Sequence, residues 1–245
     1  MKVWAYDTMK IIYFFRSLIC DFLMYFLMIS LGILGIPYAL ISRKNTYQLI
    51  RVYCKSVFFV LRFVAGLKVE IRGNVPKEPC LICSKHQSFL DVMLLASVLP
   101  NFRFIIKHQL TYLPVIGFYA RKTGCVPVNR DKKIGTVNKM LSALNQEVDR
   151  QTIVYPQGTR VLPYVKKPYK FGAGLIYKNL NQKCYLVATN TGSFWARRSL
   201  FRYPGTAILE FIDVLEPGLG LEKFMFQIED KIELASTKLM DESFS

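Results

Sequence analysis

The hydrophobic positions of this chain fall into two regions that differ in spacing. The segment from Phe22 to Ile41 contains 20 residues without a charge, and as a helix it would span roughly 30 Å, which matches a bilayer core. A second apolar stretch, Val57 to Leu67, is interrupted only by Arg62. It is short for a membrane span and is typical of a partly inserted or re-entrant helix. We therefore expect residues 1–66 to form membrane-associated helices.

The pattern leaves three arrangements of these helices open: a single span, a monotopic helical hairpin, and a buried helical core. Glycine and proline in the second half of the first stretch are expected to weaken or kink it, at Gly32, Gly35 and Pro37. A signal peptide is not indicated, because Arg16 and Asp21 interrupt the preceding apolar run and no small-residue cleavage site follows.

After residue 66 the pattern changes to short apolar runs that alternate with helical periodicity. The expected strands are Val69–Arg72, Cys80–Ser84, Phe102–Ile106, Cys125–Val128, Thr152–Tyr155, Cys184–Thr189 and Thr206–Val214. The expected helices are Leu90–Leu99, Pro114–Arg121, Lys132–Arg150, Gly172–Asn179 and Glu222–Lys238. This alternation predicts an α/β domain over residues 67–245, with a mixed, largely parallel sheet flanked by helices. Such sheets place their chemistry in the loops that follow the strands.

The charge balance narrows the choice of partner. The chain has 33 Lys and Arg against 17 Asp and Glu, a net charge of +16, and 52% of its residues are hydrophobic. A basic and apolar chain favours an anionic membrane surface over nucleic acid, for which no regular basic–aromatic interleaving or known module is present. Basic residues around the N-terminal segments place the following domain on the cytoplasmic face of the inner or plasma membrane.

The six cysteines give no metal site. Cys80 and Cys83 have the spacing of a zinc or redox pair, but no second pair or nearby histidine completes it. Residues three apart on a strand also point to opposite faces. The cysteines are therefore interpreted as core residues in a reducing compartment.

The candidate chemistry begins at His86, which follows a predicted strand and stands five residues before Asp91. On one continuous helix these side chains would lie roughly 140° apart around the axis, so they can meet only if His86 precedes the helix. Ser88 followed by Asp91 is typical of a capping box, with Ser88 as the N-cap. The pair then either forms a base and its orienting carboxylate, or consists of a helix cap beside a solvated histidine.

Cations follow several of the other predicted strands. The turn Pro156-Gln157-Gly158-Thr159-Arg160 combines a flexible glycine, a hydroxyl and a guanidinium suited to phosphate. Arg130 ends the segment that begins at Gly124, while Lys107 and Lys85 lie at the ends of two further strands. These cations are expected to meet at one edge of the sheet, where they would bind a phosphate and keep a nearby histidine neutral. Arg197 and Arg198 have no assigned role.

The order of these motifs resembles the glycerophospholipid acyltransferases, most closely the bacterial-type lysophosphatidic acid acyltransferases. His86 and Asp91 resemble the histidine–aspartate motif of that family, and residues 124–130, 156–160 and 186–192 resemble its second, third and fourth blocks. Two positions depart from the family pattern. Gln157 stands where a glutamate is usual, and Thr189 where a proline is common.

The resemblance implies transfer of a fatty acyl group from acyl-CoA or acyl carrier protein to the sn-2 hydroxyl of 1-acylglycerol 3-phosphate, giving phosphatidic acid. His86 would be the base and Asp91 its orienting group, with Gln157, Gly158 and Thr159 as a supporting turn. The resemblance also implies that Arg160, Arg130, Lys107 and Lys85 hold the phosphate of the acceptor, and that neither a metal nor an organic cofactor takes part.

Two alternatives remain open at this point. The acceptor is another lysolipid or hydroxyl compound, or the chain is a non-catalytic basic membrane protein with a weakened site. Gln157 is the feature that keeps the second alternative open, because a glutamine carries no charge.

Overall fold

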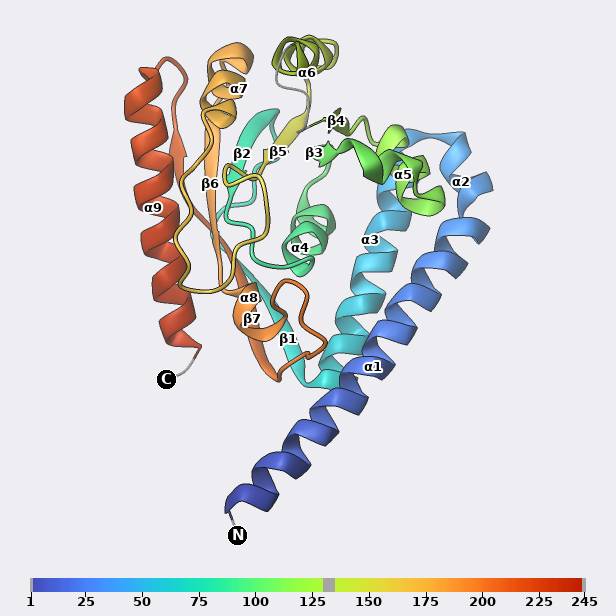
Figure 1. The fold of residues 1–245 in the computed structure, drawn as a ribbon. Coiled ribbons are helices and arrows are strands. Elements are labelled where there is room, and N and C mark those ends of the chain that lie inside the picture. The colour runs from blue at the N-terminus through green and yellow to red at the C-terminus, as the bar shows by residue number, and fades with distance from the viewer. Residues whose placement is uncertain (1, 130–134, 244–245) are drawn as a thin grey trace.

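A helical arm at the N-terminus lies beside an α/β sheet in the computed structural model, which describes residues 2–129 and 135–243 (Figure 1). The arm consists of α1 (Lys2–Leu34), α2 (Ile36–Ile41), α3 (Arg43–Val60) and a π-helical turn, η1 (Leu61–Ala65). The strands are β1 (Leu67–Arg72), β2 (Cys80–Ser84), β3 (Phe102–Lys107), β4 (Val126–Val128), β5 (Gln151–Val154), β6 (Cys184–Thr189) and β7 (Gly205–Leu215). The remaining helices are α4 (Leu90–Val98), η2 (His108–Tyr112), α5 (Pro114–Lys122), α6 (Thr136–Asn145), α7 (Gly172–Leu180), α8 (Thr191–Phe194) and α9 (Leu221–Glu242).

The sheet is mixed and largely parallel, as the sequence predicts. Its strand order within the described residues is β1-β7-β6-β2-β5-β3-β4. Strands β6, β2, β5, β3 and β4 run in one direction, whereas β7 is antiparallel to β6 and β1 is parallel to β7. The carboxyl ends of five strands therefore meet at one edge, where the sequence places the candidate chemistry.

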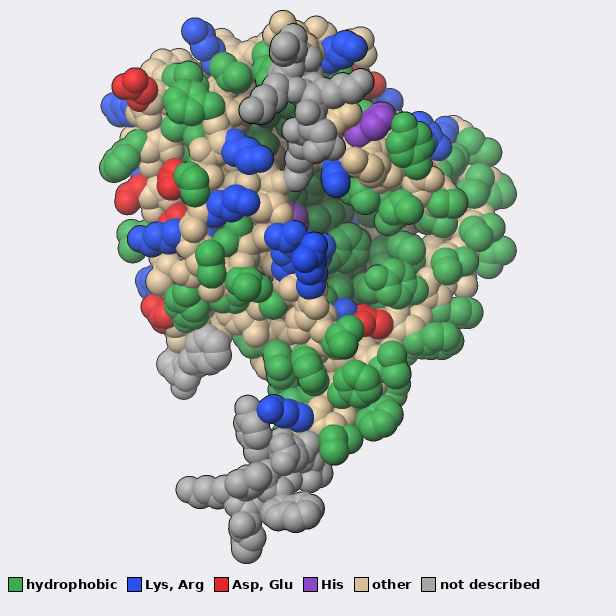
Figure 2. Space-filling model, viewed as in Figure 1, with side chains coloured by type: hydrophobic (Ala, Val, Ile, Leu, Met, Phe, Trp, Pro, Cys, Tyr) green, Lys and Arg blue, Asp and Glu red, His purple; other side chains and the backbone are tan. Residues whose placement is uncertain are grey.

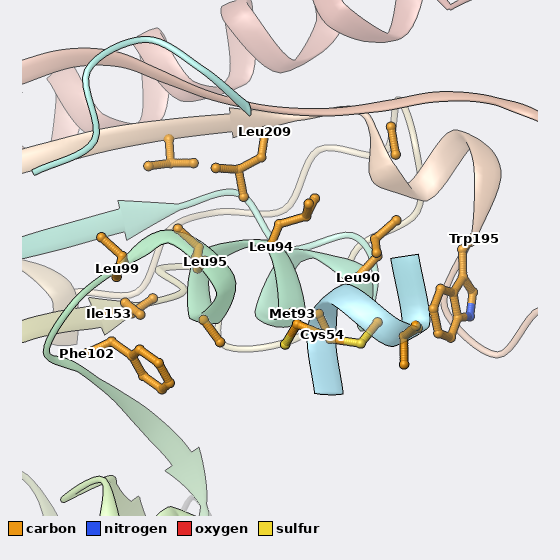
Figure 3. Close-up of a cluster of buried hydrophobic side chains, with 14 of the residues drawn as sticks. Cys54, Leu90, Met93, Leu94, Leu95, Leu99, Phe102, Ile153, Trp195 and Leu209 are labelled. Atoms are coloured by element: carbon orange, nitrogen blue, oxygen red, sulfur yellow. The ribbon is translucent and has the colours of Figure 1, made fainter. Parts of the chain in front are cut away.

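Successive residues of β2 belong to two different hydrophobic cores. Cys80 and Ile82 lie in the core that α4 and α3 cover, and Figure 3 shows the leucines of α4 between the sheet and α3. Leu81 and Cys83 lie in the core that α6, α7 and α9 cover. Cys80 and Cys83 are both buried free thiols, so the expectation that they point to opposite faces is confirmed.

Every predicted strand and helix of the α/β region is present, α9 extends four residues past its predicted end, and the sequence does not predict the short helices η2 and α8. Two larger differences concern other segments. Each predicted strand begins and ends within two residues of an observed strand. The helix predicted over Lys132–Arg150 ends earlier, at Asn145, and its residues 132–134 lie outside the described part of the chain. Its end differs because Arg150 is buried and donates hydrogen bonds to the Tyr47 hydroxyl and the Thr123 carbonyl at 2.7 and 2.9 Å.

The uncharged segment Phe22–Ile41 is not one helix, which is the second difference. Helix α1 ends at Leu34, and Gly35 separates it from α2. A Cβ atom at Gly35 would lie 2.5 Å from the Leu31 carbonyl oxygen, so the close turn requires glycine. The apolar helix extends towards the N-terminus instead. Over Met9–Leu34 it is long and apolar enough to cross a membrane.

The arm shares the first hydrophobic core with the sheet. Cys20 and Met24 of α1 and Cys54 of α3 are buried in that core beside α4. Asp21 forms an ion pair with Arg202, whose guanidinium lies 4.1 Å from the centre of the Trp195 ring. The acidic residue that interrupts the apolar helix therefore anchors α1 to the rest of the chain.

The second apolar stretch continues α3 and has two different faces. Val57, Leu61 and Ala65 are buried against the domain, whereas Phe59 and Phe63 are exposed. The first strand, β1, begins at Leu67, where the sequence places the start of the α/β region. The division of the chain at residue 67 stays a prediction.

Candidate active site

The histidine–aspartate pair forms at the carboxyl end of β2. The Nδ1 atom of His86 lies 3.1 Å from Oδ2 of Asp91. Asp91 is fully buried in the first turn of α4, while 16% of the His86 side chain is exposed. His86 precedes the helix and Asp91 lies within it, so the geometric condition stated from the sequence is met. Because Nδ1 faces the carboxylate, the Nε2 atom is the one that can exchange a proton with a ligand.

Backbone and side-chain donors surround the carboxylate of Asp91. Oδ2 accepts hydrogen bonds from the backbone N–H groups of Gln87 and Ser88 at 2.7 and 2.8 Å, and Oδ1 accepts one from the Thr191 hydroxyl. These hydrogen bonds fix the position of the carboxylate, so Asp91 holds the imidazole in one orientation.

The start of α4 has the contacts of the predicted capping box, although the assigned helix begins one residue later. The helix begins at Leu90 with Phe89 at the N-cap position, and the side chain of Phe89 makes no capping bond. Ser88 still takes part, because its Oγ atom accepts a hydrogen bond from the Leu90 N–H at 3.2 Å. Because Phe89 already has helical backbone angles and the Ser88 N–H donates to Asp91, Ser88 has the N-cap role that the sequence predicts.

An aromatic ring stacks on the imidazole of His86. The rings of His86 and Tyr155 stack with centroids 3.9 Å apart and 16° between their planes. Burial raises the pKa of the Tyr155 hydroxyl, so this tyrosine stays neutral. Stacking and the Asp91 contact together leave the imidazole little freedom to rotate.

A cavity of about 650 Å³ opens beside His86. This volume is within the range of small-molecule sites, about 300–1,000 Å³. Its inner walls are apolar and come from the helical arm as well as the domain, with Met28, Leu31, Leu49, Ile50, Phe89, Val92, Phe102, Phe104, Val115 and Ile116 among the lining residues. Figure 2 shows a hollow on this face, with Lys and Arg side chains along one rim and a continuous apolar surface on the other side.

A thiol in the cavity wall is poorly suited to act as a nucleophile. Cys125 lines the cavity, and burial raises the pKa of its thiol. Within the described part of the chain, no serine, threonine or cysteine side chain hydrogen-bonds to His86, whose one side-chain hydrogen bond goes to Asp91. A nucleophile activated by His86 therefore has to come from a bound substrate.

Several cations lie at the mouth of the cavity. Arg160, Lys107 and Lys170 line it, and Lys170 is a residue that the sequence analysis missed. Burial and the nearby charges of Arg197 and Arg198 lower the pKa of the Arg160 guanidinium. Among the described residues, no acidic side chain forms an ion pair with Arg160, Arg197 or Arg198. An anion is the partner that such a group of cations lacks.

One of the four predicted phosphate ligands is not at this mouth, and another is not among the described residues. Arg130 lies outside the described residues. Lys85 is 2% exposed, does not line the cavity, and forms an ion pair with Glu233 of α9, with Nζ–O distances of 2.6 Å. The prediction for Lys85 is therefore wrong, because it continues the alternation of β2 and points to the face opposite His86.

The supporting turn follows β5 and lies between the cavity and α9. Gln157 is 1% exposed, and its Nε2 atom donates to Oε1 of Glu233 at 3.2 Å. Gly158 has a φ of +68°, and its N–H donates to the Tyr155 carbonyl at 2.8 Å. Gly158 and Thr159 line the cavity next to Arg160. The turn therefore carries Arg160 to the mouth on one side and contacts α9 on the other.

The sequence analysis also missed Thr191, Tyr155 and Glu233. Thr191 lies within one of the stretches that resemble family blocks, and Tyr155 lies directly before another. The sequence therefore indicates that both residues lie near the site, but it does not predict their contacts with Asp91 and His86. No motif includes Glu233, which lies on a helix with ordinary amphipathic spacing.

The fold and the site together define a class of protein. It is an α/β protein with a histidine–aspartate pair at the carboxyl end of a parallel strand, beside an apolar cavity with cations at its mouth. The chain belongs to the Acyltransferase family, whose model matches residues 66–199, more than half of the sequence.

Curated relatives and a solved structure agree with this assignment. The chain is 26% identical over 213 residues to a 1-acyl-sn-glycerol-3-phosphate acyltransferase of Helicobacter pylori, covering 84% of this chain and 88% of that protein. A protein of the same name from Pseudomonas aeruginosa is 26% identical over 159 residues, 63% of this chain and 62% of its own length. The crystal structure of PlsC, the 1-acyl-sn-glycerophosphate acyltransferase of Thermotoga maritima, shares the fold with a TM-score of 0.79 at 20% identity, covering 94% of this chain and 97% of that one.

Proposed function

We propose that this protein transfers a fatty acyl group from a thioester to the sn-2 hydroxyl of 1-acylglycerol 3-phosphate and so forms phosphatidic acid. One observation carries the proposal: His86, held by Asp91, faces a single cavity that has apolar walls and a cationic mouth. A lysophospholipid has the matching chemistry, since its reactive hydroxyl lies between a hydrocarbon chain on one side and a phosphate on the other. The names of the relatives support the same acceptor.

In the proposed mechanism, the Nε2 atom of His86 takes the proton of the acceptor hydroxyl as its oxygen attacks the thioester carbonyl. Asp91 stabilises the imidazolium that forms. The C–S bond then breaks, and the imidazolium returns the proton to the departing thiolate. The residues of the chain that act in this sequence hold and move one proton, and they form no covalent bond with the acyl group.

The cations at the cavity mouth are proposed to hold the phosphate of the acceptor. Arg160 is the principal residue, because its guanidinium can form two parallel hydrogen bonds with phosphate. Lys107 and Lys170 line the same cavity, and Arg197 and Arg198 contribute positive potential from beside Arg160. Arg130 remains a predicted ligand.

The protein is also proposed to work at a membrane surface, on the cytoplasmic face of the inner or plasma membrane. Large apolar residues of α1 are exposed along its length, among them Phe15, Phe22, Phe26 and Leu34. Contiguous exposed apolar surface of this kind marks a membrane or protein interaction site. The net charge of +16 suits anionic head groups. The acyl donor is proposed to be acyl-CoA or acyl carrier protein, and no cofactor is expected.

The test is an acyl-transfer assay with the purified full-length protein, a labelled acyl thioester and a panel of acceptors. Lysophosphatidic acid should be acylated, whereas 1-monoacylglycerol, which lacks the phosphate, should be a poor acceptor. Arg160→Ala should raise the KM for lysophosphatidic acid about tenfold, since hydrogen bonds to charged groups contribute about 1.5–3 kcal/mol. It should change the rate with monoacylglycerol little.

Other outcomes would redirect the proposal. Transfer to a different lysolipid would keep the reaction and change the acceptor. Lipid binding with no transfer to any acceptor would support the non-catalytic basic membrane protein that Gln157 leaves open.

A further inference from the structure

We propose that Glu233, on the C-terminal helix α9, is a positioning residue that holds the His86 loop and the Arg160 turn in their working arrangement. The inference rests on the proposed acyl transfer. It concerns a residue outside the stretch matched by the family model and outside every motif in the sequence.

The carboxylate of Glu233 joins three segments that are far apart in the sequence. It accepts from Lys85 Nζ at 2.6 Å, from Gln157 Nε2 at 3.2 Å and from the Tyr169 hydroxyl at 3.0 Å. Lys85 directly precedes His86, and Gln157 lies three residues before Arg160. One carboxylate on α9 thus links the segment that carries His86 to the turn that carries Arg160.

The side chains that donate to Glu233 are suited to hold it in one position. Lys85 and Gln157 are 2% and 1% exposed, so neither side chain has water as an alternative partner. Burial, and then the neighbouring carboxylate of Glu233, raise the pKa of the Tyr169 hydroxyl, which remains a donor. A second bond, from the Val161 N–H to the His86 carbonyl at 2.8 Å, ties the same two segments together through their backbones.

The same contacts give Gln157 a function. Its Oε1 atom is buried and has no hydrogen-bond partner, while its Nε2 atom donates to Glu233. A glutamate at position 157 would place a second carboxylate beside that of Glu233, and two like charges at this distance disfavour each other. In this chain the carboxylate at this place comes from α9, and position 157 supplies the amide that donates to it.

The experiment exchanges the two side chains in the full-length protein. Glu233→Gln, Gln157→Glu and the double variant are compared for kcat and KM with lysophosphatidic acid, per folded molecule, together with the melting temperature. We expect Glu233→Gln to lower kcat about tenfold or more, because small displacements of catalytic groups have effects of this size. Gln157→Glu alone should also lower kcat. The double variant should recover part of the loss, since a carboxylate is again within one hydrogen bond of position 233.

The matched control is Asp230→Asn, which removes an exposed carboxylate from the same helix and should leave kcat unchanged.

Two results would overturn the proposal. Glu233→Gln with wild-type kcat per folded molecule and only a lower melting temperature would show a purely stabilising role. A double variant no more active than Glu233→Gln would show that the position of the carboxylate does not matter. An inactive wild-type protein would instead count against the proposed function, so the two failures are distinguishable.

Discussion

Lys85 and His86 follow one another at the end of β2, and each meets a carboxylate on a different face of the sheet. The Lys85 side chain is buried and forms an ion pair with Glu233 of α9. The His86 side chain contacts Asp91 of α4 and lines the cavity. The first pair joins an ammonium group to a carboxylate, and the second joins an imidazole to a carboxylate. Alternation along an extended chain thus separates a structural ion pair from a base by one residue.

The burial of the two pairs explains why their roles differ. A buried ion pair contributes little to the net free energy of unfolding. Removing one partner leaves the other charge unpaired in the interior, which lowers the free energy of unfolding by about 3–5 kcal/mol. His86 is neutral when it acts as a base, so its loss strands no charge. Breaking the first pair should therefore affect stability most, and breaking the second should affect turnover most.

The largest expected effect follows from replacing the base. His86→Ala should lower acyl transfer about 10²–10⁴-fold, which is the usual contribution of a general base. Its circular dichroism spectrum, melting temperature and binding to anionic vesicles should stay close to those of the wild type. Substantial turnover by the folded variant would rule out His86 as the base.

A smaller effect, on stability, is expected on the other face. Glu233→Ala should lower the free energy of unfolding by about 3 kcal/mol, because Lys85 then keeps a buried charge without a partner. Urea denaturation measures this difference. Asp230→Ala on the exposed side of α9 should change it by no more than about 0.5 kcal/mol. Equal effects of the two substitutions would mean that Lys85 is not a buried structural charge.

The smallest effect concerns the group that holds Asp91. Thr191→Val keeps the shape of the side chain and removes its hydrogen bond to Oδ1 of Asp91. Because the two backbone donors to Oδ2 remain, kcat should fall only about tenfold, equivalent to about 1.5 kcal/mol for one hydrogen bond to a charged group. Thr191→Ser keeps a hydroxyl and should retain more activity than Thr191→Val, and the reverse order would count against this role.

The sequence predicts the frame of the site better than its contacts. Strands β2, β3, β5 and β6 and the histidine–aspartate contact follow from local periodicity and spacing, both of which are properties of neighbouring residues. The sequence predicts Lys85 as a phosphate ligand because it stands next to His86. Adjacent residues of an extended segment face opposite ways, so Lys85 contacts Glu233 instead. Glu233 could not be found from any motif, because its role depends on a contact across 148 positions of sequence.

The break at Gly35 could be anticipated only in part. Glycine and proline composition indicates a weak point in the apolar helix, but the position of the turn depends on the close approach of the backbone to Leu31. The use of Asp21 to anchor α1 through Arg202 is likewise a tertiary contact that the sequence does not reveal.

The place of α9 has a consequence for how fragments of this gene should be cut. The family model ends at residue 199, and a fragment ending there would keep all four motifs. It would lose β7, which pairs with both β1 and β6, and it would lose the carboxylate that neutralises Lys85. Motif boundaries and folding boundaries therefore do not coincide in this chain, and a useful fragment has to extend through Glu242.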